Sequence, residues 1–146
     1  MEIRQATLRD AEEIYELGKS DSAFEVSRSI PFYERTELEE WVRSPKDNVL
    51  LVAYADGRVV GFLFCKVISH HWAMLDNFYV LPQLRQQGIG SSLLTALTGA
   101  LKSRGIEYVS ALCNANDARL LDQLSRKGFL PAKTYVWLEL FVDRHH

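Results

Sequence analysis

The feature that most constrains the fold of this chain is the glycine pair Gly88 and Gly90, which separates two apolar segments of different periodicity. Residues 72–80 before the pair alternate their side chains in the manner of a β-strand. Residues 90–103 after it place leucines at the spacing of a helix face. A strand that turns through glycines directly into a helix is typical of a sheet covered by helices, so we predict an α/β fold.

The rest of the chain supplies further strands and helices around this unit. Thr7 and Asp10 form a capping-box pattern that predicts a helix start, and Asp56-Gly57 between two apolar runs predicts a β-hairpin. With 146 residues the chain is long enough to bury one core, and we expect residues 1–146 to form a single domain. The predicted order is βααβββαβαββ. Helices are expected over residues 7–19, 36–44, 90–103 and 116–127. Strands are expected over residues 2–6, 48–55, 58–69, 72–80 and 106–113, and two more follow residue 128, the last of them over 135–142.

The near balance of charge argues against a polyanionic partner. The chain has 17 basic and 19 acidic residues, so neither nucleic acid nor an anionic membrane is a predicted partner. No stretch approaches the roughly eighteen apolar residues of a membrane-spanning helix.

Cys65 and Cys113 lie in apolar runs, which favours free thiols over a disulfide. The histidines form adjacent pairs whose side chains point apart on a strand, so no metal site is predicted. We expect a soluble, cytoplasmic protein.

The glycine pair can be tested against known phosphate-binding patterns. A P-loop needs a lysine after its second glycine, but Gly90 is followed by two serines. A dinucleotide fingerprint needs a third glycine where Leu93 stands. Backbone amides at the start of a helix can still hold an anion, with Arg85 as a nearby cation. The pair therefore predicts either an anion site or only a tight turn.

The wider sequence decides between these alternatives by resemblance. Val80-Leu-Pro-Gln-Leu-Arg-Gln-Gln-Gly-Ile-Gly90 resembles the acetyl-coenzyme A signature Arg/Gln-x-x-Gly-x-Gly/Ala of the GNAT family of N-acetyltransferases. The order of elements is also similar to that family. The resemblance implies a mixed, mostly antiparallel sheet of about six to seven strands flanked by four helices. It also implies that acetyl-coenzyme A binds as co-substrate and that the pair is both a turn and a phosphate cradle.

The resemblance further implies which residues contact the coenzyme. The backbone of Phe78, Tyr79 and Val80 would bind the pantetheine arm. Asn116 resembles an asparagine that contacts the coenzyme in relatives, although a helix N-cap is an equal alternative. The pyrophosphate would lie on the backbone amides and hydroxyls of Arg85, Gln86, Gln87, Gly88, Ile89, Gly90, Ser91 and Ser92.

An amine that attacks a thioester must lose a proton, directly or through water. Asp76 is the candidate base, because it lies on the strand leading to the coenzyme; it could instead bind a cationic substrate or serve only the sheet. The Val80 amide is the implied donor to the developing negative charge on oxygen. Where relatives carry a tyrosine as proton donor to the thiolate, this chain has Leu124. The remaining candidates are Ser125, Tyr79, Tyr135 and water, unless the thiolate leaves unprotonated.

The acceptor is predicted to be a primary amine, which attacks directly in a ternary complex. A small-molecule amine is the first hypothesis, and a protein or peptide N-terminus or a lysine is the second. Because the usual tyrosine is absent, a non-catalytic acyl-coenzyme A sensor is an alternative of another class. The residues placed at the acceptor site are Phe24, Glu25, Phe32, Tyr33, Glu34, Tyr135 and Trp137. For Trp137 and most of the other aromatic residues, a place in the core or in a homodimer contact is the stronger alternative.

Overall fold

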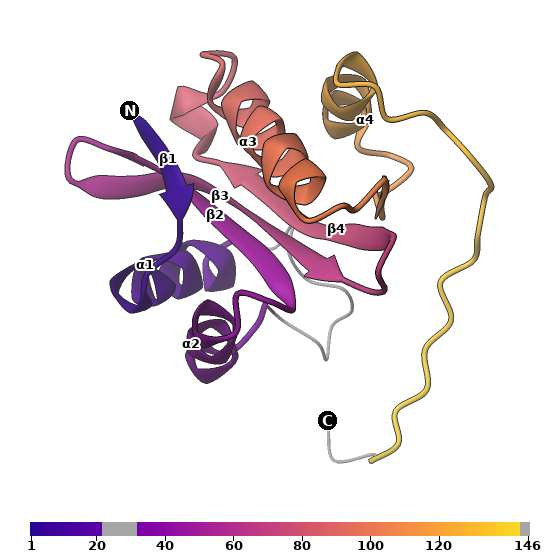
Figure 1. Ribbon diagram of the computed structural model, residues 1–146, viewed down its shortest axis with the longest axis horizontal. Helices are drawn as coiled ribbons and strands as arrows, with labels where there is room; N and C mark the ends of the chain where they lie inside the picture. The colour runs from indigo at the N-terminus through magenta and orange to yellow at the C-terminus, as the bar shows by residue number, and fades with distance from the viewer. Residues whose placement is uncertain (22–31, 144–146) are drawn as a thin grey trace.

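The protein folds around one twisted sheet with helices on both sides, as the computed structural model shows for residues 1–21 and 32–143 (Figure 1). The strand order is β1-β2-β3-β4-β5, and every pair is antiparallel except β4 with β5. Helices α1 and α2 lie on one side of the sheet and α3 on the other (Figure 1). The elements are β1 (Glu2–Gln5), α1 (Leu8–Lys19), α2 (Arg35–Arg43), β2 (Asn48–Ala55), β3 (Arg58–Val67), β4 (Trp72–Val80), a 3-10 turn (Pro82–Leu84), α3 (Ile89–Ser103), β5 (Tyr108–Ala111) and α4 (Ala118–Arg126).

Local sequence explains where several elements begin and end. At the start of α1, the Asp10 carboxylate accepts hydrogen bonds from the backbone N–H (2.7 Å) and hydroxyl (3.0 Å) of Thr7, which confirms the predicted capping box. The β2–β3 hairpin turns at Asp56 and Gly57, with φ angles of 53° and 77°. Two successive positive φ angles match the right-handed twist of the strands and favour Asp-Gly, as predicted.

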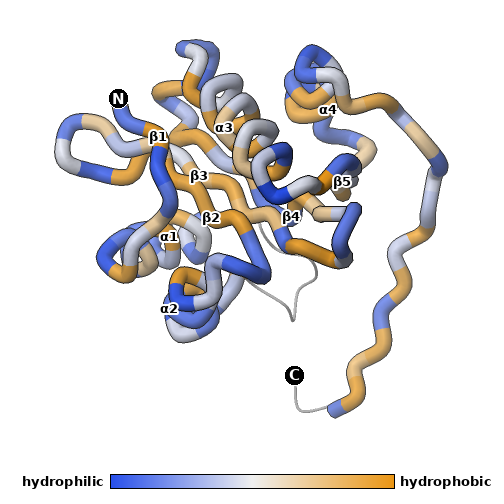
Figure 2. The backbone as a smooth tube through the Cα atoms, in the orientation of Figure 1, coloured by the Kyte–Doolittle hydropathy of each residue, from blue (hydrophilic) through white to orange (hydrophobic). Residues whose placement is uncertain are grey.

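The core lies on both faces of β2 and β3. Most residues of these two strands are buried, because α1 and α2 cover one face and α3 covers the other. Figure 2 shows the same pattern as an apolar band through the centre of the sheet. The largest buried side chains include Phe62 and Phe64 of β3 and Leu93 and Leu97 of α3.

The end of the chain differs from the prediction. The described residues form five strands rather than six or seven, because none of those after α4 is in a strand. Strand β5 covers four residues rather than the eight of 106–113. Residues 130–142, the C-terminal segment, run clear of the sheet in an extended course (Figure 1). An apolar, alternating sequence predicts strand conformation, but it does not specify which sheet edge will pair with it.

Within the described residues, no helix combines the length and apolar character needed to cross a bilayer.

Candidate functional site

The site forms where β4 continues beyond the end of β5. The last pair between these strands is Leu75 with Ala111, so the backbone from Asp76 to Val80 has no neighbouring strand of the described sheet on that side. Hydrogen-bonded and non-hydrogen-bonded pairs alternate along an antiparallel ladder. Because the Leu81 N–H donates to the Val60 carbonyl (2.9 Å), the next pair, Val80 with Gly61, directs its backbone groups away from β3. The Val80 N–H therefore faces the open side.

The same alternation means that only two of the three residues expected to bind the coenzyme through their backbone, Phe78 and Val80, direct it toward the open side. Phe78, two residues before Val80, also directs its N–H and C=O toward the open side, whereas Tyr79 directs them toward Phe62 of β3. The Arg85 Nε donates to the Val80 carbonyl (2.8 Å), and its guanidinium lies 5.5 Å from the centre of the Tyr79 ring. Arg85 thus braces the end of β4 against the following turn.

The two glycines have different physical roles in that turn. Gly88 has φ 86° and precedes the first residue of α3, a left-handed conformation that favours glycine. Gly90 is helical, but a Cβ there would lie 2.2 Å from Gln123 Nε2 and 2.9 Å from Phe78 Cζ, so it permits α3 to approach both β4 and α4. The N–H groups of the first helical turn have no partner inside the helix and carry its partial positive charge. The turn is therefore suited to an anion.

A cavity of about 610 Å³ opens over this turn and extends to α4. Sequence reasoning missed its second wall, to which α4 contributes Arg119 and Arg126, followed by Lys127. Arg126 pairs with Asp122 (2.8 Å), and the Lys127 ammonium donates to the Thr95 hydroxyl (2.8 Å). The seven-residue spacing of the two arginines places them on one helix face, so a basic face on this helix could have been predicted from the sequence. The cavity is lined by Val80, Leu84, Arg85, Gln86, Gly88, Ile89, Gly90, Ser91, Arg119, Asp122, Gln123, Arg126 and Lys127.

Asn116 does not cap the helix that follows it. Asp117 is the N-cap, with its carboxylate accepting from the Leu120 N–H (3.1 Å), so the capping alternative for Asn116 is wrong. Asn116 is exposed, and its own N–H donates to the Asn114 side chain (2.8 Å).

Asp76 is turned toward the α2 side of the sheet by a β-bulge. Cys65 and Phe64 of β3 pair with Leu75 and Asn77, so Asp76 is the extra residue of β4. The simple alternation that would place Asp76 in a row with Met74, Phe78 and Val80 is therefore broken, because a bulge re-aims the side chain. The Tyr33 hydroxyl donates to the Asp76 carboxylate and accepts from Asn77 Nδ2 (2.7 Å).

Tyr33 is held firmly in this network. Its ring contacts Trp41 at 4.7 Å and Phe64 at 5.8 Å between centroids. Burial, and then the hydrogen bond to Asp76, raise the pKa of Tyr33 well above its ordinary value of 10.0. Tyr33 therefore stays protonated and donates to Asp76 throughout the physiological pH range.

The other predicted acceptor residues are dispersed. Phe32 is buried against Phe62, so it belongs to the core. Glu34 is exposed at the N-cap of α2, and Phe24 and Glu25 lie outside the described residues. Tyr135 and Trp137 are exposed on the C-terminal segment. Among the described members of this set, Tyr33 is the residue that is hydrogen-bonded to Asp76.

The candidates for donating a proton to a leaving thiolate lie in different parts of the fold. Leu124 is buried in the face of α4 that packs on the core, Ser125 is exposed, and Tyr135 is on the C-terminal segment. Tyr79 is buried in the strand that carries Val80. Burial, and then the Asp21 carboxylate, raise the pKa of Tyr79, so its hydroxyl keeps its proton at neutral pH.

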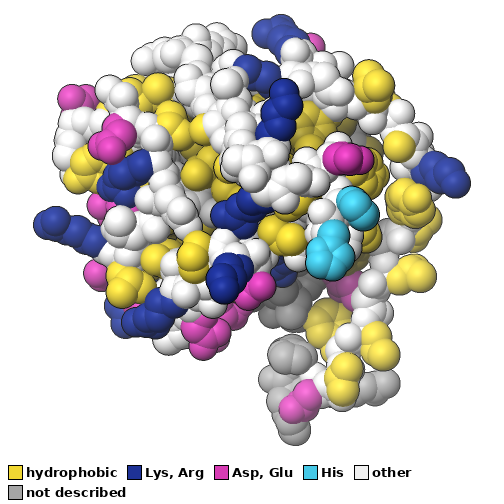
Figure 3. Space-filling model, viewed as in Figure 1, with side chains coloured by type: hydrophobic (Ala, Val, Ile, Leu, Met, Phe, Trp, Pro, Cys, Tyr) yellow, Lys and Arg dark blue, Asp and Glu magenta, His cyan; other side chains and the backbone are white. Residues whose placement is uncertain are grey.

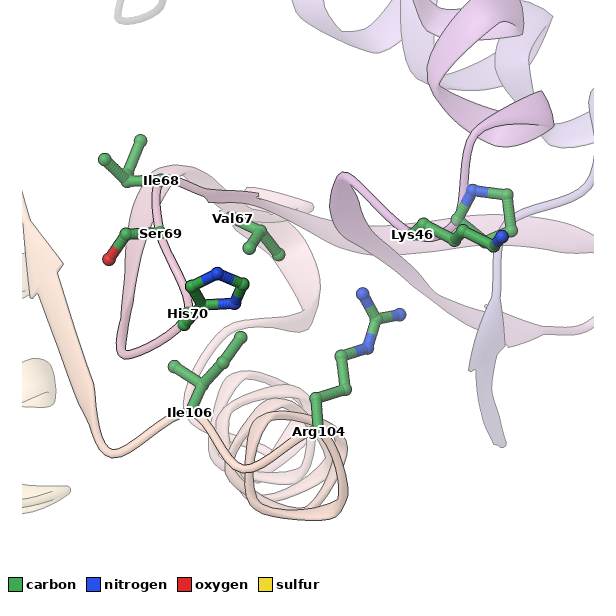
Figure 4. A pocket seen from close by; sticks show the side chains of 8 residues that line it. Lys46, Val67, Ile68, Ser69, His70, Arg104 and Ile106 are labelled. Carbon is green, nitrogen blue, oxygen red and sulfur yellow. The ribbon is translucent and has the colours of Figure 1, made fainter.

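A second cavity, of about 810 Å³, lies at the opposite end of α3. Figure 4 shows Arg104 directed into it, with Lys46 and His70 on its walls. The Arg104 guanidinium also donates to the Asn48 carbonyl (3.2 Å), which ties α3 to β2. On the surface seen in Figure 3, basic and acidic side chains are interspersed rather than gathered by sign. No group of three or more His, Cys, Asp and Glu side chains in the described part of the chain is placed to hold a metal ion.

Comparisons with known proteins agree with this geometry. The spermidine N(1)-acetyltransferase of Thermoplasma acidophilum is 25% identical over 122 residues, which is 73% of each chain. An aminoglycoside acetyltransferase from an uncultured soil sample, solved with sisomicin, has a TM-score of 0.78 at 20% identity over 97% of this chain and 96% of that one. The PaiA N-acetyltransferase of Thermoplasma acidophilum, solved with coenzyme A, has a TM-score of 0.72 at 22% identity over 92% of both chains.

The predicted fold class is thus confirmed, apart from the number of strands. A sequence profile described as the acetyltransferase (GNAT) family matches residues 10–129, which include the bulged strand, the glycine turn and α4. Because that match extends over most of the chain and its order of elements, the protein belongs to the GNAT family of acetyltransferases.

Proposed function

We propose that residues 1–146 form one catalytic domain that transfers the acetyl group of acetyl-coenzyme A to a primary amine of a small molecule. The observation that carries the proposal is the cavity that joins Val80, at the open end of β4, to the amides at Gly88 and the cationic wall of α4. Asp76 lies on the same strand at the bulge, four residues before Val80.

The residues of β4 and of this cavity fit the coenzyme. The outward-facing N–H and C=O of Phe78 can pair with the amides of a pantetheine arm as an added strand would, and the Val80 N–H lies further along the same open edge toward the thioester. The amides from Gln86 to Ser91 suit a pyrophosphate, and Gly88 leaves its surroundings open to it, because nothing lies within 4 Å of a Cβ built there. Arg119 and Arg126 supply positive charge for a further phosphate. Asn116 is kept as a contact to the coenzyme, because it is exposed near the start of α4.

The coenzyme supplies an activated acyl group as a thioester, and the protein supplies position and proton transfer. The Val80 N–H faces the open side of β4, where it can donate to the thioester oxygen. Its carbonyl is held by Arg85, which fixes the orientation of the strand end. Tyr79 keeps its proton at neutral pH and is the candidate donor to the leaving thiolate in place of Leu124.

Asp76 is the proposed base. Tyr33 and Asn77 fix the orientation of its carboxylate through the Tyr33 hydroxyl, and one oxygen is left to receive the amine proton directly or through water. The carboxylate also attracts the protonated form of the amine, so binding and deprotonation would occur at one place. The similarity to a spermidine acetyltransferase, and to an aminoglycoside acetyltransferase in fold, supports a small polycationic acceptor.

The first experiment measures thiol release from acetyl-coenzyme A over a panel of polyamines, aminoglycosides and peptides with free N-termini or lysines. We expect the highest kcat/KM with a small polyamine or aminosugar. All these acceptors present a primary amine, so the assay compares them directly. Turnover confined to the peptides would show that the acceptor is a peptide or protein and not a small molecule.

The second experiment tests Asp76 and Tyr33 separately. Asp76→Asn keeps the size of the side chain and should lower kcat by about 10²-fold or more if the carboxylate accepts the proton. Tyr33→Phe keeps the ring contacts with Trp41 and Phe64 but removes the hydroxyl that orients the Asp76 carboxylate, so it should lower kcat, though by less than Asp76→Asn does. An Asp76→Asn enzyme with unchanged turnover and pH profile would show that Asp76 is not the base.

The cationic wall is tested by binding alone. Arg119→Ala should weaken coenzyme A binding several-fold, on the order of 3- to 10-fold at low ionic strength, and the loss should shrink with added salt. Arg58→Ala removes an exposed arginine from the β2–β3 hairpin and is the matched control. Equal affinities of the two variants in calorimetry would remove α4 from the coenzyme site.

A further inference from the structure

The cavity at the C-terminal end of α3 is separate from the coenzyme site and has no part in the proposed reaction. Its volume of about 810 Å³ falls within the roughly 300–1,000 Å³ that is typical of small-molecule sites. Its walls come from three stretches that are far apart in the sequence, namely the segment before β2, the β3–β4 hairpin and the turn after α3. It shares no lining residue with the coenzyme cavity.

One side of the cavity is apolar. Val67 and Ile106 direct their side chains into it, whereas the side chains of Ile68 and Ser69 point away (Figure 4). Pro45 contributes a further apolar wall. A molecule with an apolar body therefore gains free energy by covering this side, because apolar surface is then removed from water.

The other side of the cavity is positively charged. Figure 4 shows the Arg104 guanidinium directed into it, and Lys46 lies on its wall. Neither residue pairs with a carboxylate of residues 1–21 or 32–143, and none of the described residues that line the cavity is acidic. The Arg104 Nη1 donates to the neutral Asn48 carbonyl (3.2 Å), and a guanidinium has five N–H groups, so further donors remain for a ligand.

Backbone hydrogen bonds hold the walls in place without a ligand. The Val67 N–H donates to the Asp47 carbonyl (3.0 Å), which ties the segment before β2 to β3. The Ile106 N–H donates to the Leu101 carbonyl (3.0 Å), which fixes the turn after α3 and occupies one of the last carbonyls of that helix. The partial negative charge of a helix end resides on its unpaired carbonyls, so this bond makes the end of α3 less unfavourable to an anion. A ligand here does not have to order the walls as it binds.

We propose that this cavity is a second small-molecule site, which binds a carboxylic acid with a compact apolar body. Arg104 holds the carboxylate, since a guanidinium and a carboxylate pair through two parallel hydrogen bonds. Lys46 adds a second positive charge, and Val67 and Ile106 contact the apolar body. An inorganic anion uses only the cationic side of the cavity, and a neutral apolar molecule uses only the other side. The coenzyme cavity lies at the opposite end of α3, so the two ligands bind at the same time.

The first test is a titration of the full chain with phenylacetate, followed by backbone amide shifts in nuclear magnetic resonance at saturating coenzyme A. We expect saturable binding with a Kd of roughly 0.1–1 mM and shifts concentrated at Val67, His70 and Ile106. Phosphate lacks the apolar body and 2-phenylethanol lacks the charge, so each should bind about tenfold more weakly at these residues. A response that does not saturate, or equal binding of phosphate or 2-phenylethanol, overturns the proposal.

The second test compares variants in the same titration. Arg104→Gln should weaken phenylacetate binding by about tenfold, because it removes the charge that faces the carboxylate. Lys102→Gln removes an exposed charge from the last turn of α3, outside the cavity lining, and should bind as the wild type does. Arg104 also ties α3 to Asn48, so thermal unfolding checks each variant, and Lys46→Gln on another wall should weaken binding about two- to threefold. The proposal is wrong if Arg104→Gln binds as tightly as Lys102→Gln, or if Lys46→Gln has no effect.

Discussion

Gly88 offers a direct test of the role assigned to the turn before α3. Its φ of 86° is left-handed, and nothing lies within 4 Å of a Cβ built there, so Gly88→Ala perturbs the backbone alone. An L-residue in this conformation costs roughly 1–2 kcal/mol, offset by about 0.4–1 kcal/mol from the reduced freedom of the unfolded chain. The net destabilisation should be about 1 kcal/mol.

Gly99 provides a matched control within the same helix. It is exposed, lies inside α3 and has open space at its Cβ. Gly99→Ala should therefore stabilise the protein by about 0.5–1 kcal/mol through helix propensity. The two variants should differ by about 2 kcal/mol, or roughly 4–8 °C in Tm for a chain of this size.

The assay combines thermal unfolding with calorimetric titration of coenzyme A. Relief of the strain at Gly88 moves the amides before α3, so Gly88→Ala should also weaken coenzyme A binding by about tenfold, or 1.4 kcal/mol. Gly99→Ala should bind as the wild type does. The reasoning is refuted if both variants gain stability equally and bind the coenzyme with unchanged affinity. That result would show that the left-handed conformation at Gly88 does not require glycine and that the turn does not contribute to coenzyme binding.

Two further predictions concern buried groups away from the site. Burial alone raises the pKa of Asp10, but hydrogen bonds from Arg4 and Thr7 outweigh it and lower the pKa below its ordinary 3.8. The ionised Asp10 with Arg4 therefore stabilises the fold above about pH 4. The free energy of unfolding, measured in urea, should fall as the pH drops below that value. Arg4→Met should cost about 2 kcal/mol at neutral pH, less than a fully buried pair because Arg4 is partly exposed. Burial raises the pKa of Cys65 to about 12, so a chromogenic disulfide should label the half-buried Cys113 first and Cys65 only on unfolding; equal rates would contradict this.

The elements that the sequence predicted well are those with local causes. The hairpin at Asp56 and Gly57, the cap formed by Thr7 and Asp10, and the helix after Gly90 each depend on residues within a few positions of one another. Propensity, capping and turn conformation act over that range, so these elements could be read from the chain without knowledge of its neighbours.

The site was predictable in part for the same reason. Gly88 and Gly90 belong to a contiguous motif, but the cations of α4 reach the same cavity from about thirty residues further along the chain. Asn116 resembled a cap, yet Asp117 took that place because its carboxylate reaches the Leu120 N–H. Choices between adjacent residues depend on backbone angles that a pattern does not contain.

Tertiary structure alone decided the orientation of Asp76 and the fate of the C-terminal segment. The bulge opposite Phe64 and Cys65 turned Asp76 toward Tyr33, a residue 43 positions away, and no periodicity of β4 by itself contains that extra residue. Residues 135–142 had the sequence of a strand, but a strand needs an edge to pair with, and the edge is supplied by another part of the fold. The sequence thus determined the four helices, the strands before residue 81 and the turn before α3, because these follow from local interactions. Pairing between distant segments determined how the Asp76 carboxylate faces Tyr33 and which sheet edge remains open.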